Sequence, residues 1–450
     1  MSDREGNLEA PIRHSVDWKN PVFYDQAACE AEMERIFDIC HGCRRCVSLC
    51  QSFPTLFDLV DATADGEVHG VHKEDFWSVV AHCYLCDLCY VTKCPYVPPH
   101  PWNLDFPHTM LRAKAIKFKN GGVSAGERFL ASTDTHGQFA GIPVVVQLVN
   151  ALNQTRPVRK ALGSALHVHP DAWLPALATR RFRWSFDKGD SATTIVNGAR
   201  TPGKVVIFST CYVNYNEPGI GFDLIKLLEH NDIAYEVVDK ESCCGMPQLE
   251  LGDLEGVAKH KQANIPVLAR YAREGWAILS AIPSCTLMFK QELPLLFPGE
   301  ADVVAVQKAM FDPFEYWMAR HKDGLLKVDF KAALGKVSYH VPCHGRVQRV
   351  GKKTEEVFRL IAQTVSVQLN TVERCSGHAG TYGVKTASHA NATKIGKPVF
   401  KAMARGKPDF ISSDCALAGH HIAQGMAAGS LPAAKLAHPL SLMRLAYGLE

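Results

Sequence analysis

The sequence predicts an α+β protein of several domains, in which a helical, cysteine-rich N-terminal domain precedes two copies of a small α/β module. Three observations support this fold class. The chain has 450 residues, enough for about three domains of ~150 residues each. None of its 16 cysteines lies in residues 101–200, and the C-terminal half contains an internal repeat.

The N-terminal domain is expected over residues 25–105, where two runs each hold four cysteines. The runs CHGCRRCVSLC (40–50) and CYLCDLCYVTKCP (83–95) follow the spacing of two-cluster bacterial ferredoxins. In that pattern three cysteines of a run bind one cubane, and the fourth binds the other. We therefore expect two [4Fe-4S] clusters: the first on Cys40, Cys43, Cys46 and Cys94, and the second on Cys50, Cys83, Cys86 and Cys89.

Zinc is the alternative occupant of these runs, but zinc favours paired Cys-x2-Cys knuckles over triplets with a remote fourth thiol. Two features depart from the ferredoxin pattern: Gln51 stands where proline is usual, and four residues precede Cys94. The connecting stretches SFPTLFDLVDA and HKEDFWSVVAH are apolar at helical spacing, so an α-helical ferredoxin domain is predicted. Cys29 is expected to be a small buried residue and not a ligand.

Residues 106–200 form a basic, partly helical linker. Between His108 and Lys188 there are twelve Lys and Arg against four Asp and Glu. The stretch GIPVVVQLVNALNQ is apolar at helical spacing until Pro157 breaks the pattern. Two interpretations stay open: a solvated linker whose helix covers a core, or a helix that contacts a partner or an anionic membrane surface.

The internal repeat defines the two modules, over residues 201–330 and 331–425. Cys211 and Cys343 are 132 residues apart, as are Cys243 and Cys375, and GKVVIFSTC (203–211) matches GKVSYHVPC (335–343). In each copy β-branched runs alternate with helical patterns, which predicts a mostly parallel sheet with the cysteines beyond its carboxyl edge. The last residues, 426–450, are expected to form a C-terminal helical tail.

The repeated cysteines are the candidate ligands of a third iron–sulfur site. In CCG (243–245) and CSG (375–377), Gly245 and Gly377 would let the backbone turn close to an inorganic cluster. The alternative is that these cysteines are merely small buried residues at an interface between the modules. The candidates are Cys211, Cys243, Cys244 and Cys285 in module 1, and Cys343, Cys375 and Cys415 in module 2.

Composition excludes several classes of protein. No run of about 18 apolar residues is present, so no membrane-spanning helix is expected. The N-terminus MSDREGNLEA does not resemble a signal peptide, and so many cysteines in a reducing compartment indicate metal or redox chemistry. We expect a cytoplasmic protein, with the inner face of the cytoplasmic membrane as a further location and no nucleic-acid partner.

Together these motifs resemble a known family. Two ferredoxin motifs followed by repeated Cys, Cys-Cys-Gly and Cys elements are similar to the iron–sulfur subunit of anaerobic glycerol-3-phosphate dehydrogenase, to the CCG-domain subunit of heterodisulfide reductase and to the iron–sulfur subunit of glycolate oxidase. The string CSGHAGTYGVK (375–385) is the most distinctive. The resemblance covers residues 30–100 and 203–425.

The resemblance also implies which ligands are missing. Heterodisulfide reductases bind non-cubane clusters with five thiolates per module, but Ile282 occupies one such position in module 1, and Ser376 and Ser412 occupy two in module 2. Module 1 keeps four thiols, enough for a cubane, and module 2 keeps three. His344 and His378 are the candidates for a further donor in module 2.

The predicted function follows from the expected clusters and from the lack of nucleotide-binding motifs in the sequence. The chain has no dinucleotide-binding Gly-x-Gly-x-x-Gly after a strand and no P-loop, so no flavin is expected on it, and no catalytic residue is assigned. By the resemblance, it is an electron-transfer subunit and not a stand-alone enzyme. It would pass electrons from a flavoprotein dehydrogenase acting on glycerol 3-phosphate, lactate or glycolate toward membrane quinone, with the basic linker against the bilayer.

Two alternatives remain open. The modules could reduce a disulfide directly, as in heterodisulfide reductase, although the substitutions at 282, 376 and 412 count against this. The chain could also donate electrons to a soluble metalloenzyme.

Overall fold

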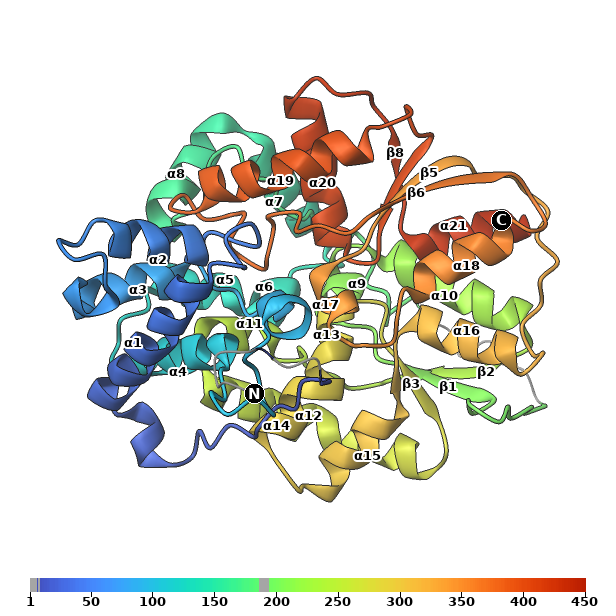
Figure 1. Ribbon diagram of the computed structural model, residues 1–450. Coiled ribbons are helices and arrows are strands. Elements are labelled where there is room, and N and C mark those ends of the chain that lie inside the picture. The colour runs from blue at the N-terminus through green and yellow to red at the C-terminus, as the bar shows by residue number, and fades with distance from the viewer. Residues whose placement is uncertain (1–5, 7–8, 186–193) are drawn as a thin grey trace.

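The computed structural model describes residues 6, 9–185 and 194–450 (Figure 1). Lys188, at the end of the basic stretch, and most of the N-terminal segment before Glu9 lie outside the described residues. Helices occupy the N-terminal and middle blocks, and two β-sheets lie in the C-terminal half.

The N-terminal block is helical, as predicted. Its first long helix, α1, begins where the Asp25 side chain accepts a hydrogen bond from the amide of Ala28, and it ends at Arg44, whose φ of 51° stops the helix. The first cysteine run therefore starts on the last turn of α1 and continues into the loop after it. The elements are η1 (Pro21–Tyr24), α1 (Gln26–Cys43), α2 (Ser52–Asp61), η2 (Val68–Gly70), η3 (Lys73–Asp75), α3 (Phe76–Ala81), η4 (Cys89–Lys93) and α4 (Phe106–Lys119).

The described residues of the middle block form four further helices. Thr155 separates the last two, because Pro157 lies in the first turn of the helix that follows. The sequence pattern predicted this break. The elements are α5 (Ala125–Ala131), α6 (Thr133–Gly137), α7 (Pro143–Gln154) and α8 (Arg156–Leu166).

Each module contains a four-stranded sheet, and both sheets are fully parallel. The strand orders, β2-β1-β3-β4 and β6-β5-β7-β8, are equivalent, which confirms the internal repeat. The strands are short and mainly buried, because helices cover both faces of such sheets. The strands are β1 (Lys204–Ile207), β2 (Ala234–Val237), β3 (Ala277–Leu279), β4 (Met310–Phe311), β5 (Gly335–His340), β6 (Val367–Val372), β7 (Phe410–Ser413) and β8 (Lys435–Leu436).

The helices of module 1 connect its strands and extend beyond β4. They are α9 (Cys211–Tyr215), α10 (Pro218–His230), α11 (Met246–Leu251), α12 (Leu254–Arg273), α13 (Pro283–Leu287), η5 (Met288–Glu292), α14 (Leu293–Leu296), α15 (Ala301–Ala309) and α16 (Pro313–Lys322). Those of module 2 are α17 (Cys343–Arg346), α18 (Lys353–Ile361), α19 (His389–Met403), α20 (Ala416–Ala428) and α21 (Pro439–Tyr447).

The C-terminal segment joins the two modules. Residues 426–450 are helical only in part, because β8 adds a strand to the second sheet before α21 begins. Helix α21 then packs on α10 of module 1, where the Tyr447 hydroxyl donates to the carbonyl of Lys327 at 2.6 Å (Figure 1). One hydrophobic core runs from the N-terminal helices through both modules.

None of the helices in the described part of the chain combines the length and the apolar character needed to cross a bilayer.

Candidate metal centres

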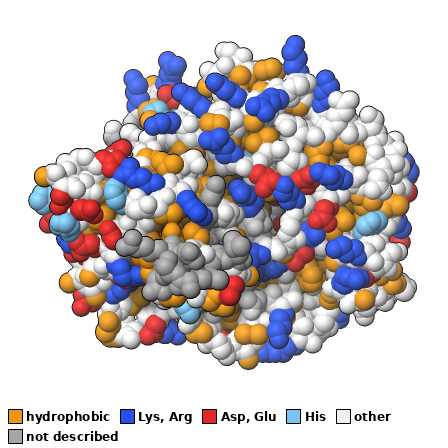
Figure 2. Space-filling view, in the orientation of Figure 1, with side chains coloured by type: hydrophobic (Ala, Val, Ile, Leu, Met, Phe, Trp, Pro, Cys, Tyr) orange, Lys and Arg blue, Asp and Glu red, His pale blue; other side chains and the backbone are white. Residues whose placement is uncertain are grey.

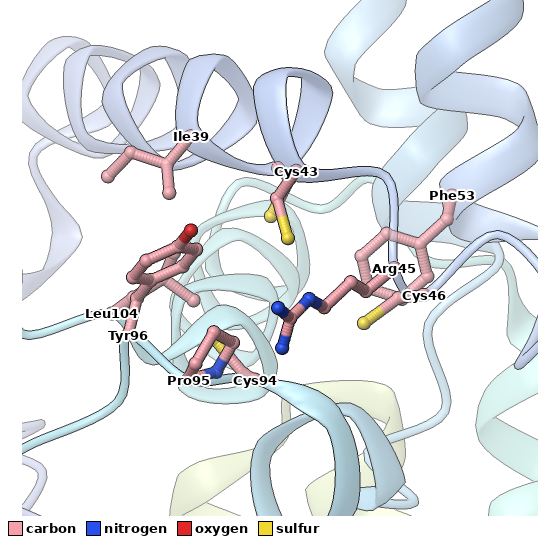
Figure 3. Close-up of a pocket in the computed structure, with 10 residues that line it drawn as sticks. Ile39, Cys43, Arg45, Cys46, Phe53, Cys94, Pro95, Tyr96 and Leu104 are labelled. Atoms are coloured by element: carbon pink, nitrogen blue, oxygen red, sulfur yellow. The ribbon is translucent and has the colours of Figure 1, made fainter. Parts of the chain in front are cut away.

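The four cysteines assigned to the first cluster face one pocket (Figure 3). The pocket is partly open to solvent, and its walls include the apolar side chains of Ile39, Phe53 and Leu104. The Arg45 guanidinium extends between the sulfurs, where a cation offsets thiolate charge. The cysteines in the lining are Cys40, Cys43, Cys46 and Cys94.

The four cysteines assigned to the second cluster also come together. The Cys89 thiol is close enough to Cys50, Cys83 and Cys86 for each of them to raise its pKa, after the larger effect of burial. It is also under the influence of Cys46 from the first group. The two groups are therefore neighbours, as in a two-cluster ferredoxin.

These thiols fit an iron–sulfur cluster on the chemistry of the donors. Burial, followed by the charge of neighbouring sulfurs, raises the pKa of Cys40 well above its usual range, and burial raises the pKa of Cys50 to about 12. Four crowded thiolates are unstable unless a cation binds them, because they repel one another in a buried site. Iron would supply that charge and release the protons.

A single metal ion is a different case. Within the described residues, no set of three or more Cys, His, Asp or Glu side chains is close enough to hold one ion. The thiolates around an iron–sulfur cluster lie farther apart than the ligands of a single ion, because each thiolate binds a different iron atom.

A buried ionic network fixes the second cysteine run. Arg13 forms ion pairs with Asp87, which lies between Cys86 and Leu88, and with Asp105 at 2.9 Å. His108 lies 3.3 Å from Asp105 and 3.5 Å from Glu292. Burial and Arg13 lower the pKa of His108, but the two carboxylates outweigh them and raise it to about 9. The sequence patterns gave no indication of this network, since its members are single charged residues far apart in the chain.

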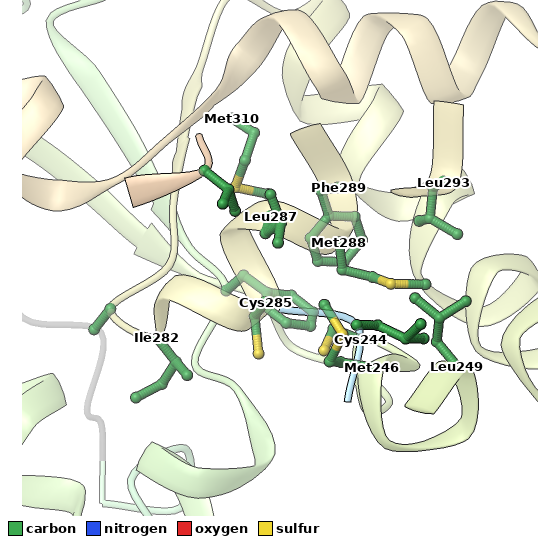
Figure 4. Packing of buried hydrophobic residues seen from close by; sticks show 14 of the residues in the cluster. Cys244, Met246, Leu249, Ile282, Cys285, Leu287, Met288, Phe289, Leu293 and Met310 are labelled. Atoms are coloured by element: carbon green, nitrogen blue, oxygen red, sulfur yellow. The ribbon is translucent and has the colours of Figure 1, made fainter. Parts of the chain in front are cut away.

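The four cysteines of module 1 form a chain of thiol contacts, from Cys211 through Cys243 and Cys244 to Cys285. Cys211 is the first residue of α9, Cys243 and Cys244 precede α11, and Cys285 lies on α13. Hydrogen bonds from Cys211 and Cys244 lower the pKa of Cys243 and raise their own. Figure 4 shows Cys244 and Cys285 close together beneath Met288, with Ile282 on the segment before α13. The structure thus brings together all four predicted module 1 residues.

The backbone of module 1 is strained beside these thiols. Thr210, which precedes Cys211, is buried and has a φ of 66°, a conformation that a β-branched residue rarely adopts. Gly245 has a φ of 95°, which allows the turn after Cys244. Such strain persists only where surrounding packing imposes it, and it is concentrated at functional sites.

Two residues of the middle block complete module 1, and sequence patterns did not reveal them. The Asp134 carboxylate accepts hydrogen bonds from the Cys243 amide at 2.7 Å and the Ser242 hydroxyl at 2.8 Å. The buried Thr133 hydroxyl faces the sulfurs of Cys211 and Cys243 and has no other partner among the described residues. From within the module, Asn264 donates to the Cys243 carbonyl at 2.9 Å.

Module 2 brings its three cysteines beside the second cysteine run of the N-terminal block. Burial raises the pKa of Cys343, and Cys375 and Cys415 add to the effect. The two largest electrostatic contributions to the raised pKa of Cys86 come from Cys343 and Cys375, ahead of Cys50. The loop after Cys375 is also tied to the N-terminal block, because His82 Nδ1 lies 2.8 Å from the Tyr382 hydroxyl.

Gly377 is required at its position in module 2. Its φ is 84°, and an added Cβ would clash with the carbonyl oxygen of Ala392. Both candidate histidines are neutral at pH 7, because burial lowers the pKa of His344 to about 4 and that of His378 to about 3. The Nε2 atom of His344 is buried without a hydrogen-bond partner in the described residues, whereas the His378 ring lies 5.6 Å from that of His421.

Comparison with known proteins identifies the modules. The model of the cysteine-rich CCG domain matches residues 205–290 and again residues 337–422. Each match covers the strands β1 to β3 or β5 to β7 and all the cysteines of that module.

Three relatives have similar sequences. One subunit of the anaerobic glycerol-3-phosphate dehydrogenase of Escherichia coli is 27% identical over 321 residues, 70% of this chain and 76% of that protein. One subunit of the fumarate reductase (CoM/CoB) of Methanothermobacter marburgensis is 26% identical over 55% of this chain and 47% of its own. Lactate utilization protein A of Shouchella clausii is 26% identical over 47% of this chain and 87% of its own. The chain therefore contains two cysteine-rich CCG domains and is similar, over 70% of its length, to a subunit of anaerobic glycerol-3-phosphate dehydrogenase.

Proposed function

We propose that this chain is the electron-transfer subunit of a flavoprotein dehydrogenase complex and passes electrons toward membrane quinone. One observation carries the proposal: the thiol groups lie in series. Cys46 of the first group is near Cys89 of the second, and Cys86 of the second is near Cys343 and Cys375 of module 2. Module 1 would be the third occupied site, because four thiols meet there. It adjoins the series, since Glu250 is close enough to interact with both Cys243 of module 1 and Cys343 of module 2.

The protein holds and insulates these sites. Cysteine thiolates from the end of α1 and the loop after it, and from the segment after α3, would bind two [4Fe-4S] clusters, and those of module 1 a third. When bound, such clusters accept and release electrons one at a time. Burial of Cys83, Cys89, Cys243, Cys244 and Cys285 limits the access of water to the second site and to module 1, and the Arg13 network and Asp134 fix the loops that present these cysteines.

The donor is proposed to be a separate flavoprotein subunit. Relatives named as subunits of glycerol-3-phosphate dehydrogenase and fumarate reductase support a complex of this kind, and the name of the lactate utilization protein supports a 2-hydroxy acid as a second substrate class. Glycerol 3-phosphate, lactate and glycolate are therefore the donor substrates to test. The complex would work at the inner face of the cytoplasmic membrane.

Direct reduction of a disulfide is the second candidate. It is favoured by the strained Thr210 beside the module 1 thiols and by the relative named as a CoM/CoB fumarate reductase. Ile282, where the resemblance implies a fifth thiol, counts against it.

The test is to purify the chain anaerobically together with the proteins that it binds. Reduction of the chain by a bound flavoprotein and one of the three substrates, followed by reoxidation by a soluble quinone analogue, is the expected result. Turnover of a disulfide by the chain alone would instead support the second candidate. A complex with a soluble metalloenzyme and no flavoprotein would contradict both.

A further inference from the structure

Helix α7 turns its apolar side chains outward. Val144 is 77% exposed and Leu148 is 58% exposed, and of the large apolar residues of the helix only Val146 is buried. Its polar Asn150 faces the protein instead, where it exchanges two hydrogen bonds of 2.9 Å with the backbone of Leu177. A helix that covers a core has the reverse arrangement. Of the two sequence interpretations of this stretch, the structure therefore supports a contact helix.

Neighbouring segments enlarge this exposed surface. The Trp184 ring is 64% exposed and packs against Gly141, just before α7, and the Arg181 guanidinium lies 3.7 Å from the ring centroid. We call the whole surface the α7 patch. It consists of Phe139, Ile142, Val144, Leu148, Val149, Leu152 and Trp184.

The charges around the α7 patch are mainly positive. Residues 139–184 contain six Lys and Arg and a single acidic residue, Asp171. Arg156 and Lys160 are exposed on α8, directly after α7. Lys and Arg side chains also gather along the upper left edge of the molecule, over α8 and α19 (Figure 2).

We propose that the α7 patch and its basic flank are the surface by which this chain docks on a bilayer of anionic phospholipid. The inference deepens the proposed function, since it rests on an acceptor that lies in the membrane. Aliphatic side chains in line along one helix, an aromatic residue with an arginine at the edge, and cations behind them suit the boundary between acyl chains and acidic head groups. A contact with an acidic protein would instead favour fewer contiguous aliphatic residues and more paired polar groups.

The test uses the full-length chain, with its clusters and without any partner. Binding is measured by co-flotation with phosphatidylcholine vesicles containing about one third phosphatidylglycerol, and with pure phosphatidylcholine as the neutral probe. Strong binding to the anionic vesicles, weakened by salt, is expected. Brominated acyl chains should also quench the fluorescence of Trp184, which the Trp184→Phe variant would identify among the seven tryptophans.

Two variants separate the apolar and electrostatic contributions to vesicle binding, and a third is their control. Val144→Gln with Leu148→Gln should weaken binding by more than about tenfold, because it removes apolar area that enters the bilayer. Arg156→Gln with Lys160→Gln should weaken it by about fivefold per charge at low salt. The matched control, Val22→Gln with Val328→Gln, changes two exposed valines outside the α7 patch and should bind as the wild type.

Two results would overturn the inference: no binding of the wild type to anionic vesicles, or equal binding by the Val144→Gln, Leu148→Gln variant. If that variant binds vesicles normally but loses a co-purified flavoprotein subunit, the α7 patch is a protein interface instead. These outcomes are independent of electron transfer, because the vesicles contain no quinone and the clusters are assayed separately.

Discussion

The two modules share one scaffold and differ in how their thiol sites are completed. Both have the same parallel strand order and an equivalent glycine of positive φ, Gly245 in module 1 and Gly377 in module 2. In module 1 four thiols are joined by contacts between neighbouring pairs, and the residue before Cys211 is strained at a φ of 66°. In module 2 the equivalent residue, Pro342, is relaxed at a φ of −71°, and only three thiols remain.

The two modules therefore keep the same sheet topology but differ in the residues that surround their cysteines. Module 1 draws Thr133 and Asp134 from the middle block to complete its loop, whereas module 2 places Cys343 and Cys375 against Cys86 of the N-terminal block. We interpret module 1 as a site that holds its own cluster, and module 2 as a wall of the second N-terminal site.

The largest expected effect is on module 1. Cys244→Ser should remove about four of about twelve irons per chain, since a cubane needs its four thiolates. Cys29→Ser is the matched control, because Cys29 is also fully buried but lies in α1 and away from the proposed sites. Iron and sulfide analysis of both variants is the measurement. Equal iron in the two would contradict a cluster in module 1.

A cysteine-to-serine substitution in module 2 should leave the iron content unchanged. Cys375→Ser removes a thiol that influences Cys86 and Cys50, so we expect an altered EPR signal from the second N-terminal cluster at constant iron. Loss of about four irons would show that module 2 holds a cluster of its own.

Introducing thiols into module 2 should allow it to bind a cluster, as proposed for module 1. Ser376→Cys with Ser412→Cys introduces two sulfurs at buried positions, and the Ser412 hydroxyl has no hydrogen-bond partner to lose in the described residues. We expect a gain of up to about four irons per chain, because five thiols would then be available. No gain, in a variant that folds as the wild type, would mean that the loop geometry excludes a cluster.

The ionic network beside the second N-terminal site should make the stability of the folded chain depend on pH. The folded pKa of His108, about 9, lies above its usual 6.5, so its contribution is complete below pH 6.5 and is lost as pH rises through 9. The shift corresponds to roughly 3 kcal/mol of unfolding free energy. Denaturant titrations from pH 6 to 10 should show this decline, and the decline should be absent in His108→Gln. A similar slope in both proteins would assign the effect to other groups.

The smallest effect is expected at the support of module 1. Asp134→Ala leaves the Cys243 amide without its acceptor, at a cost of about 1–3 kcal/mol, whereas the Ser242 hydroxyl keeps His260 Nδ1 at 2.6 Å. The module 1 EPR signal should shift, and the signals of the N-terminal clusters should not. Asp171→Ala, in the same block, is the control. A shift in the N-terminal signals alone would contradict the assignment of Asp134 to module 1.

Much of the fold followed from periodic signals in the sequence. The 132-residue repeat predicted the two equivalent sheets, and β-branched runs located three strands in each. The fourth strands, β4 and β8, have only two residues each, too few to show alternation. They depend on pairing with β3 and β7, which only the folded chain provides.

The candidate sites were predictable only where the spacing of cysteines in the sequence indicates the ligands of a cluster. The cysteine groups of both N-terminal sites and of module 1 come together as predicted, although iron binding stays a proposal. Asp134 and Arg13 had no signal, because each is a single charged residue whose partner lies 109 or 74 positions away. The outward face of α7 was also ambiguous, since an apolar stripe does not indicate what it faces.

The most direct test of the central claim is EPR spectroscopy with iron and sulfide analysis on wild-type chain purified without oxygen. We expect a brown protein with about twelve irons and matching sulfide, and reduced signals from three clusters, two of them spin-coupled. A colourless protein that contains zinc and no reducible centre would contradict the claim.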